Sequence, residues 1–231
     1  MLSSLFTFIS DYWVAILITS VLSYLVGSVD FAILVTKHYQ KKDIRECGSG
    51  NAGMTNVMRS VGKKAGIITF VGDVLKGAVA VVAGYFILKA FAGDFPDADY
   101  IALCGAYIAG IFDILGHIFP LYFGFKGGKG VATSVGIMAV TDWRVCLMVI
   151  AVFAIVVVAT RYISAGSVLG AFTFVVATIL LRGLDSQSPD YFVAVSIIAG
   201  IIIGFSVMFK HKANVQRLIA GTESKFKIKG E

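Results

Sequence analysis

The sequence predicts an all-α, polytopic integral membrane protein: a bundle of seven transmembrane helices forming one domain over residues 1–231. The first observation is composition, because 58% of the residues are hydrophobic, 15% are charged and the mean hydropathy is +0.86. One soluble core could not bury so much apolar material in a chain of this length. The other observations are the lengths of the apolar stretches and the side on which basic residues gather.

Six apolar stretches are close to the roughly 17–25 residues that a helix needs to cross a bilayer. They are residues 12–36, 65–91, 100–119, 145–160, 163–181 and 191–209. A seventh stretch, 131–141, is too short to cross alone. It could cross if the helix begins at Lys129 and Gly130 and neighbouring helices shield its polar end.

The lysines and arginines predict the orientation. With seven spans, only Lys89, Arg144 and Arg182 fall in the loops of one side, where aspartates also collect. Because basic residues mark cytoplasmic loops, we expect the C-terminus in the cytoplasm and the N-terminus outside. Six spans would put the later basic loops on the wrong side. The basic residues expected on the cytoplasmic side are Lys37, Lys41, Lys42, Arg45, Arg59, Lys63, Lys64, Lys126, Lys129, Arg161, Lys210, Lys212, Arg217, Lys225, Lys227 and Lys229.

Other global features restrict the class further. Residues 1–10 have no basic segment and no small-residue cleavage site, so the first span is expected to be retained. Cys47, Cys104 and Cys146 show no paired spacing, which argues against a disulfide framework or a thiolate metal site. The net charge of +6 follows from the loop bias and favours anionic lipid head groups, so no nucleic-acid partner is expected.

A polar block at residues 48–59 separates two apolar stretches. Its three glycines let the backbone turn N–H groups toward a ligand. Arg59 adds a planar fork that suits phosphate. The block therefore predicts an anion-binding surface at the membrane edge, with further donors from Ser49, Asn51, Thr55 and Asn56.

A second block, residues 124–133, superficially resembles a nucleotide-binding P-loop. It fails that test because Gly130 follows Lys129 where Ser or Thr is needed, and no strand precedes it. Glycines with Lys126 and Lys129 at the start of a helix still predict a phosphate pocket, since helix N-terminal amides and lysine charges act together.

A third block follows the last apolar stretch and contains His211, Asn214 and Arg217. If that span continues as helix past Phe209, the first two share a face and could contact one ligand. Under the predicted topology all three blocks lie on the cytoplasmic side, so residues far apart in sequence can form one site.

The charged residues within the predicted spans include Asp30, Asp73, Lys76 and Asp113. Charged side chains are costly in hydrocarbon, so they should face the bundle interior or the interface. Asp73 and Lys76 are three residues apart and could pair on one helix face. We interpret this group as structural support rather than as part of the chemistry.

Three long segments match a known family in the same order along nearly the whole chain. They read Gly-Ser-Gly-Asn-x-Gly-x-Thr-Asn-Val-x-Arg at 48–59, Gly-His-x-Phe-Pro at 116–120 followed by Phe-Lys-Gly-Gly-Lys-Gly-Val-Ala-Thr at 125–133, and His-x-x-Asn-x-x-Arg-Leu-x-x-Gly-Thr-Glu-x-Lys at 211–225. The chain thereby resembles the bacterial membrane acyl-phosphate:glycerol-3-phosphate acyltransferases of the PlsY type. It departs from their pattern at Ala52, where proline is usual, and at Met54, where a small residue is usual.

The resemblance implies transfer of a fatty acyl group from acyl phosphate to the sn-1 hydroxyl of glycerol 3-phosphate, giving 1-acyl-sn-glycerol 3-phosphate (lysophosphatidic acid) and inorganic phosphate, for phospholipid biosynthesis. It implies partners limited to these substrates and membrane lipids, no cofactor and no metal, and a multi-pass protein of the bacterial inner (cytoplasmic) membrane whose active site faces the cytoplasm.

The resemblance also implies roles by motif position. The residues expected at the reacting centre are Ser49, Arg59, Lys129, His211 and Asn214. Those expected to bind substrate are Asn51, Thr55, Asn56, Lys126, Gly127, Gly128, Gly130, Thr133, Ser164 and Arg217. Glu223 is expected to brace the tail by pairing with a basic neighbour, beside the structural Asp73 and Lys76. The proton acceptor stays open between His211 and the substrate's own phosphate.

Two other function classes fit part of the pattern. A carrier for phosphate esters would use the same glycines and basic residues, but no inverted repeat or pair of broken midplane helices is visible, as alternating access usually requires. A lipid-binding scaffold fits the hydrophobicity but leaves the three donor-rich blocks without a role.

Overall fold

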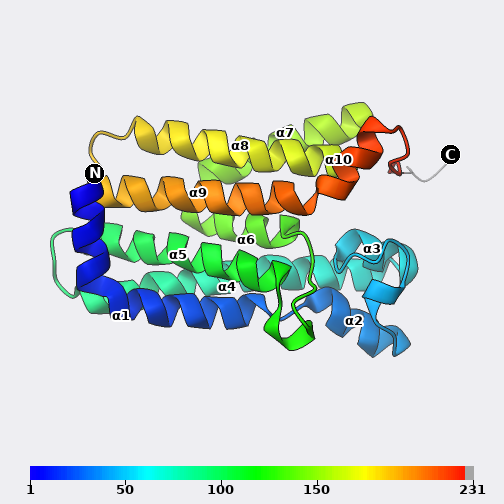
Figure 1. The fold of residues 1–231 in the computed structure, drawn as a ribbon, viewed down its shortest axis with the longest axis horizontal. Helices are drawn as coiled ribbons and strands as arrows, with labels where there is room; N and C mark the ends of the chain where they lie inside the picture. Colours follow the sequence, from blue (N-terminus) through cyan, green and yellow to red (C-terminus); the bar gives the residue numbers. More distant parts are fainter. Residues whose placement is uncertain (227–231) are drawn as a thin grey trace.

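The computed structural model describes residues 1–226, which fold as a bundle of α-helices with two short 3-10 turns (Figure 1). The elements in chain order are α1 (Leu2–Gly27), α2 (Phe31–Gln40), η1 (Ile44–Glu46), α3 (Met54–Ser60), α4 (Lys63–Ala92), α5 (Ala98–Ile118), η2 (Leu121–Phe123), α6 (Val131–Thr141), α7 (Trp143–Thr160), α8 (Ile163–Gly183), α9 (Asp190–Lys210) and α10 (Lys212–Ile219).

The predicted all-α membrane class is confirmed. Six helices of the described chain are long and apolar enough to cross a membrane, when α1 and α2 are taken together as Leu2–Gln40. The predicted boundaries of the other five long spans agree with the helices to within a few residues. Lys227 and Lys229, which the sequence places in the basic tail, lie outside the described residues.

The first predicted span, 12–36, is wrong as one continuous helix. The chain leaves helical geometry between α1 and α2, where the Asp30 carboxylate accepts a hydrogen bond from the Ile33 N–H at 3.1 Å and so caps α2. At the other end α1 starts at Leu2 and is kinked at Tyr12, with φ −113° and ψ 16°. Apolar composition alone could not reveal the break, because the residues flanking it are as hydrophobic as the helices.

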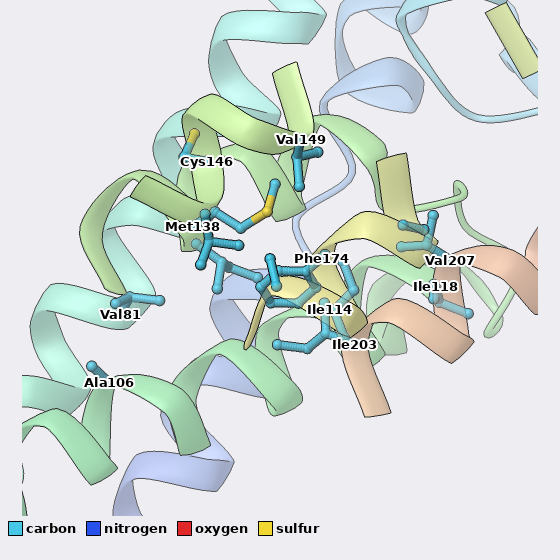
Figure 2. Packing of buried hydrophobic residues seen from close by; sticks show 14 residues of the cluster. Val81, Ala106, Ile114, Ile118, Met138, Cys146, Val149, Phe174, Ile203 and Val207 are labelled. Atoms are coloured by element: carbon cyan, nitrogen blue, oxygen red, sulfur yellow. The ribbon is translucent and has the colours of Figure 1, made fainter. Parts of the chain in front are cut away.

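The short helix α6 lies inside the bundle. Eleven residues rise only about 16 Å, roughly half of a bilayer core. Ile137 and Met138 of α6 join a buried cluster with side chains of α4, α5, α7, α8 and α9 (Figure 2). Phe174 and Ile203 from α8 and α9 lie in that cluster. Enclosure by neighbouring helices therefore makes the short helix tolerable. The helix begins at Val131 rather than at Lys129 and Gly130, so that part of the expectation is wrong.

Glycines allow the closest helix contacts. On α4 and α5, a Cβ added to Gly84 would lie 2.5 Å from the Gly105 carbonyl oxygen, and one added to Gly105 would lie 2.3 Å from that of Gly84. Small residues at helix interfaces let backbones approach in membranes, where dispersion contacts replace the hydrophobic driving force. This contact fixes α5, whose last turn borders the functional site.

The three polar blocks gather at one end of the bundle. In Figure 1, α2, α3, the segment between α5 and α6, and α10 lie at the right-hand end, with the C-terminal part of the described chain. The N-terminus and the α4–α5 and α8–α9 connections lie at the opposite end. The fold thus brings together segments that are more than 150 residues apart in sequence.

Candidate active site

A cavity of about 720 Å³ opens where the three blocks meet. Most of the predicted site residues form its wall. These are Ser49, Asn51, Thr55, Asn56, Arg59, Gly127, Lys129, Gly130, Ser164, His211, Asn214, Arg217 and Glu223, together with Asp73. Lys76, Lys126, Gly128 and Thr133 are outside the wall. The blocks therefore do converge on one cavity.

Asn56 organises the first block. Its Nδ2 amide donates to the carbonyls of Ile44, Cys47 and Asn51 at 2.9–3.2 Å, and its Oδ1 accepts from the Ser49 N–H at 3.0 Å. The side chain is almost completely buried. Asn56 borders the cavity, but its hydrogen-bonding groups are all paired with backbone groups of the loop. It therefore holds the neighbouring cavity-lining residues in place and has no free donor for a ligand.

Arg59 is the exposed cation of this block. It lies in the last turn of α3 and faces the cavity, and no hydrogen bond or ion pair of its side chain is seen within residues 1–226. Ser49 and Thr55 line the same wall. An unpaired guanidinium beside hydroxyl groups can form the two parallel hydrogen bonds that bind phosphate.

The second block is held by backbone contacts that the sequence did not indicate. The N–H groups of Gly127 and Gly128 donate to the carbonyls of Ile118 and His117, both at 3.2 Å. These two amides therefore satisfy the C-terminal end of α5 and are not available to a ligand. The amides that remain free are those at the start of α6, where Val131 and Ala132 line the cavity.

Arg45 clamps the first block to the second. Its Nη1 donates to the carbonyls of Phe123 at 2.6 Å and Lys126 at 3.1 Å, while the rest of its guanidinium binds the Asp43 carboxylate. This pairing lowers the pKa of Asp43, chiefly through the side-chain hydrogen bond from Arg45. The Lys126 side chain is exposed and does not line the cavity.

Two glycines are required by the geometry of the second block. Gly130 has φ +85° and forms the N-cap of α6, which a residue with a side chain adopts only under strain. A Cβ at Gly128 would lie 2.3 Å from both the Ala52 carbonyl oxygen and His117 Nε2. Thr133, predicted to bind substrate, is fully buried on α6 outside the cavity wall.

A polar chain links the second and third blocks. Lys129 Nζ donates to Asn214 Oδ1, and Asn214 Nδ2 donates to Glu223 Oε1 at 2.7 Å. Arg217 Nε then lies 2.6 Å from Glu223 Oε2, which confirms the predicted pairing of Glu223 with a basic neighbour. Both polar ends of the Asn214 amide are thus occupied, so this residue orients Lys129 and Glu223.

Partial burial affects the charges of Lys129 and Glu223 in this hydrogen-bonded series. The pKa of Lys129 is lowered to about 8, chiefly by burial; the Glu223 charge opposes this, and the Arg217 and Lys210 charges add to it. Burial raises the pKa of Glu223, but hydrogen bonds from Asn214 and Arg217 outweigh this and hold it below its ordinary value. Lys129 is therefore a cation at neutral pH that loses its charge in mildly alkaline solution.

The last long helix, α9, continues past Phe209 to Lys210, but His211 lies at the junction of α9 and α10, so the condition of one continuous helix through His211 and Asn214 is not met. Its Nδ1–H donates to the Val207 carbonyl at 2.8 Å, which leaves Nε2 as an acceptor. Burial lowers the pKa of His211 to about 4. The imidazole is therefore neutral at physiological pH and lines the cavity as a hydrogen-bond acceptor.

Deeper in the bundle, Asp73 and Lys76 form the predicted ion pair, with 3.1 Å between Oδ1 and Nζ. Lys76 Nζ also donates to the carbonyls of Gly27 at 3.1 Å and Val29 at 2.7 Å, where α1 ends. It lies 2.9 Å from His117 Nδ1. Lys76 thus satisfies backbone groups left open by the break after α1, as expected of a structural residue.

An apolar pocket of about 280 Å³ adjoins the polar cavity. The two share Phe70, Val131, Phe153 and Ser167 in their walls. The pocket extends between α4, α6, α7, α8 and α9, toward Met138, Val149 and other side chains of the buried cluster. A cavity lined by cationic side chains thus lies next to a pocket lined by apolar ones.

The family model described as glycerol-3-phosphate acyltransferase matches residues 17–221. The glycerol-3-phosphate acyltransferase of Thermoanaerobacter pseudethanolicus (strain ATCC 33223 / 39E) is 40% identical to this chain over 214 residues, covering 93% of this chain and 97% of the relative. This chain belongs to the glycerol-3-phosphate acyltransferase family. The acyltransferase of Clostridioides difficile (strain 630) is also 40% identical, over 219 residues, with 93% of this chain and 97% of the relative covered.

The structure of this chain is also similar to solved structures. The crystal structure of PlsY (YgiH), an integral membrane glycerol 3-phosphate acyltransferase, in its glycerol 3-phosphate form is 31% identical, with a TM-score of 0.75 over 92% of this chain and 96% of that chain. Its lysophosphatidic acid form is 30% identical, with a TM-score of 0.72 over 92% and 95% of the two chains. The resemblance to this family is confirmed, and the chain is an integral membrane acyltransferase.

Sequence reasoning missed three residues that form or support this cavity. His117 and Lys210 line the cavity, and Arg45 ties two blocks together. His117 lies within the matched 116–120 segment and Lys210 directly precedes His211, so both had a positional signal. Arg45 had none, because the contacts by which it joins the two blocks are to backbone carbonyls. Within residues 1–226, no three His, Cys, Asp or Glu side chains lie close enough together to hold a metal ion.

Proposed function

We propose that this protein transfers a fatty acyl group from acyl phosphate to the sn-1 hydroxyl of glycerol 3-phosphate, releasing lysophosphatidic acid and inorganic phosphate. The observation that carries the proposal is the convergence of the three polar blocks on one cavity that adjoins an apolar pocket. Both substrates carry phosphate and one carries an acyl chain, so the reaction needs both kinds of surface.

The cationic side chains around the cavity suit two phosphate groups. Arg59, Lys129, Lys210 and Arg217 line the wall, and the start of α6 adds backbone N–H groups. Of these, Arg217 is already paired with Glu223. Positive groups fixed around the leaving phosphate and the carbonyl oxygen would stabilise the negative charge that develops there. The acyl chain would extend into the apolar pocket.

The reaction follows from the chemistry of a mixed anhydride. The hydroxyl oxygen of glycerol 3-phosphate attacks the acyl carbonyl carbon, and the carbon–oxygen bond to phosphate breaks as the tetrahedral intermediate collapses. Phosphate leaves with the bond's electron pair, and the hydroxyl proton passes to a base. Phosphate is a good leaving group, so the step does not require a covalent nucleophile of the protein.

The base is either His211 or a phosphate oxygen of a substrate. A pKa of about 4 makes His211 a weak base, whereas a phosphate monoester has a second pKa of about 6. The acceptor nitrogen of His211 can still orient the attacking hydroxyl. If His211 is an essential base, His211→Gln should abolish turnover while glycerol 3-phosphate binding persists. Turnover within about tenfold of wild type would rule that role out.

We further propose that residues 1–231 form one transmembrane domain with seven spans, α6 included, in the bacterial inner membrane, with the cavity facing the cytoplasm. Two observations support this arrangement. The N-terminus and the described C-terminal region lie at opposite ends of the bundle, as an odd number of crossings requires (Figure 1). The cavity end carries most of the basic loop residues, which favour the cytoplasmic side.

The proposed reaction can be measured with the purified protein in detergent, as release of phosphate from palmitoyl phosphate with and without glycerol 3-phosphate, in the presence of chelator. We expect release to depend on glycerol 3-phosphate. Arg59→Ala should reduce kcat/KM by roughly 100-fold, because it removes a bidentate charged contact. Lys126→Ala, a basic residue of the second block outside the cavity wall, is the matched control and should stay near wild type.

If a folded sample released no phosphate in a glycerol-3-phosphate-dependent way, acyl phosphate would not be the acyl donor. The carrier alternative would then be tested by the flux of labelled glycerol 3-phosphate into liposomes that contain the protein. Flux without acyl transfer would replace the proposal, because a carrier uses the same anion-binding groups.

A further inference from the structure

His117 occupies an unusual position in the last turn of α5. Its side chain is almost completely buried, with the residue 3% exposed, yet it forms part of the cavity wall. It is one of three histidines in the chain. His38 is exposed on α2, away from the cavity, and His211 lies on the opposite, C-terminal side of the site.

The contact with Lys76 indicates which nitrogen of His117 carries the proton. The ammonium nitrogen lies 2.9 Å from Nδ1, and an ammonium group can only donate. Nδ1 must therefore accept, so the imidazole is neutral with its hydrogen on Nε2. Lys76 is itself fixed by the Asp73 carboxylate and by the carbonyls of Gly27 and Val29.

The Nε2–H edge of His117 faces the place where the first two blocks meet. The Gly128 backbone lies against it, since a Cβ at Gly128 would be 2.3 Å from Nε2 and equally close to the Ala52 carbonyl oxygen. Within residues 1–226, Nε2 makes no hydrogen bond. A donor held rigidly at a cavity wall without a protein acceptor is suited to a ligand oxygen.

We propose that His117 is a substrate-binding residue whose Nε2–H donates to an oxygen of a phosphate group in the cavity. The identity of that phosphate rests on the proposed function, because acyl phosphate and glycerol 3-phosphate offer the same chemistry. Lys76 and Asp73 act as positioning residues that hold the imidazole in the donating tautomer. The buried Asp73–Lys76 ion pair thus affects ligand binding through the imidazole ring of His117.

Two substitutions distinguish the roles of the two ring nitrogens of His117. His117→Gln puts an amide N–H near the position of Nε2 and so retains the donor to the ligand. His117→Asn puts an amide oxygen near the position of Nδ1 and so retains the acceptor for Lys76. Inorganic phosphate is the probe, and its dissociation constant is measured from the thermal stabilisation of the purified protein in detergent.

We expect His117→Asn to weaken phosphate binding by roughly tenfold or more while keeping a melting temperature close to wild type. His117→Gln should retain phosphate binding within a few-fold although it loses the Lys76 contact. His38→Asn, the exposed histidine, is the matched control and should leave phosphate binding unchanged. Equal losses in the Asn and Gln variants, or no loss in the Asn variant, would overturn the proposal.

Kinetics then identify the phosphate. A raised KM for acyl phosphate in His117→Asn would show that His117 contacts the phosphate of acyl phosphate. A raised KM for glycerol 3-phosphate would show that it contacts the phosphate of glycerol 3-phosphate. If the wild-type protein shows no acyl transfer but phosphate binding still follows the Asn–Gln distinction, the proposed function fails and the His117 contact stands.

A measurement without a His117 variant keeps the test independent of folding. With ring-¹⁵N histidine, His117 should appear as the Nε2–H tautomer and His211 as the Nδ1–H tautomer, while His38 is assigned with His38→Asn. Phosphate should shift the Nε2–H resonance of His117. A protonated Nδ1 at His117, or no shift at saturating phosphate, would overturn the proposal.

Discussion

Two polar networks border the same cavity, but they differ in depth. The inner network joins Asp73 and Lys76, whose side chains are each 3% exposed. The outer network ends in Arg217 and Glu223, and the arginine side chain is 46% exposed. The inner network contacts the end of α1, whereas the outer one joins side chains of the second and third blocks.

The difference shows that burial decides what an ion pair contributes. Removing one partner of a buried pair leaves an uncompensated charge and costs about 3–5 kcal/mol. Exposed pairs contribute about 0–1 kcal/mol because water screens them. The inner network should therefore stabilise the fold, and the outer network should mainly adjust the charge presented to a ligand. Of the four predictions that follow, three test this division and one tests the contact between the first two blocks.

Lys76→Met should have the largest effect. It leaves Asp73 buried without its cation and the Gly27 and Val29 carbonyls without a donor, so we expect the apparent melting temperature to fall by roughly 10 °C or more. Lys89→Met is the matched control on the same helix, because Lys89 pairs with Asp99 at 2.7 Å on the exposed surface. Equal melting temperatures for the two variants would remove the distinction between the networks.

Gly128→Ala should mainly affect activity. The added Cβ would collide with the Ala52 carbonyl and with His117, pushing the two blocks apart. Displacement of about 1 Å at an active site costs on the order of 100-fold in rate, and we expect a loss of that size in kcat/KM. Gly183→Ala, at a helical glycine with nothing within 4 Å, is the control. A Gly128→Ala enzyme near wild-type activity would show that the blocks need not touch.

The outer network predicts a pH dependence. Lys129 is charged below its pKa of about 8 and neutral above it, so raising the pH through this value removes a positive charge from the cavity. The KM for glycerol 3-phosphate should rise about tenfold between pH 7 and pH 9. Lys129→Arg should abolish the rise, since arginine stays charged across this range. A rise that persists in Lys129→Arg would assign it to another group.

Glu223→Gln should have the smallest effect. The amide oxygen can still accept from Asn214, but the negative charge that supports Lys129 is lost, so the pKa of Lys129 should fall below 8. We expect KM at pH 7.5 to rise two- to fivefold and the alkaline rise to begin at lower pH. Glu46→Gln, outside the cavity wall, is the control. An unchanged pH profile would contradict coupling through Glu223.

Local spacing predicted part of the site correctly. Asp73 and Lys76 are three residues apart on one helix, so their pairing followed from the sequence. The pairing of Glu223 with a basic neighbour was implied by the resemblance, and the structure identifies that neighbour as Arg217. The partner of Lys76 on α5, His117, is 41 residues away and was not foreseen. Sequence spacing describes neighbours on one helix, whereas contacts between helices depend on how the bundle packs.

The sequence also could not distinguish donors for the ligand from donors for the fold. The amides of Gly127 and Gly128, and the side chains of Asn56 and Asn214, all suggested ligand contacts. Each is occupied by a protein partner instead. A motif shows that donors are present, but only the folded chain shows which acceptors reach them first, because buried polar groups must be paired.

By itself, the sequence determined the membrane class, the positions of five long helices and the three polar blocks that line the cavity, because hydrophobic length and local composition are properties of contiguous residues. The tertiary structure alone decided the break between α1 and α2, the junction at His211 and the connection from Lys76 through His117 to the cavity. These features arise where backbone groups left open by one helix meet side chains of another, and no contiguous stretch of sequence contains both partners.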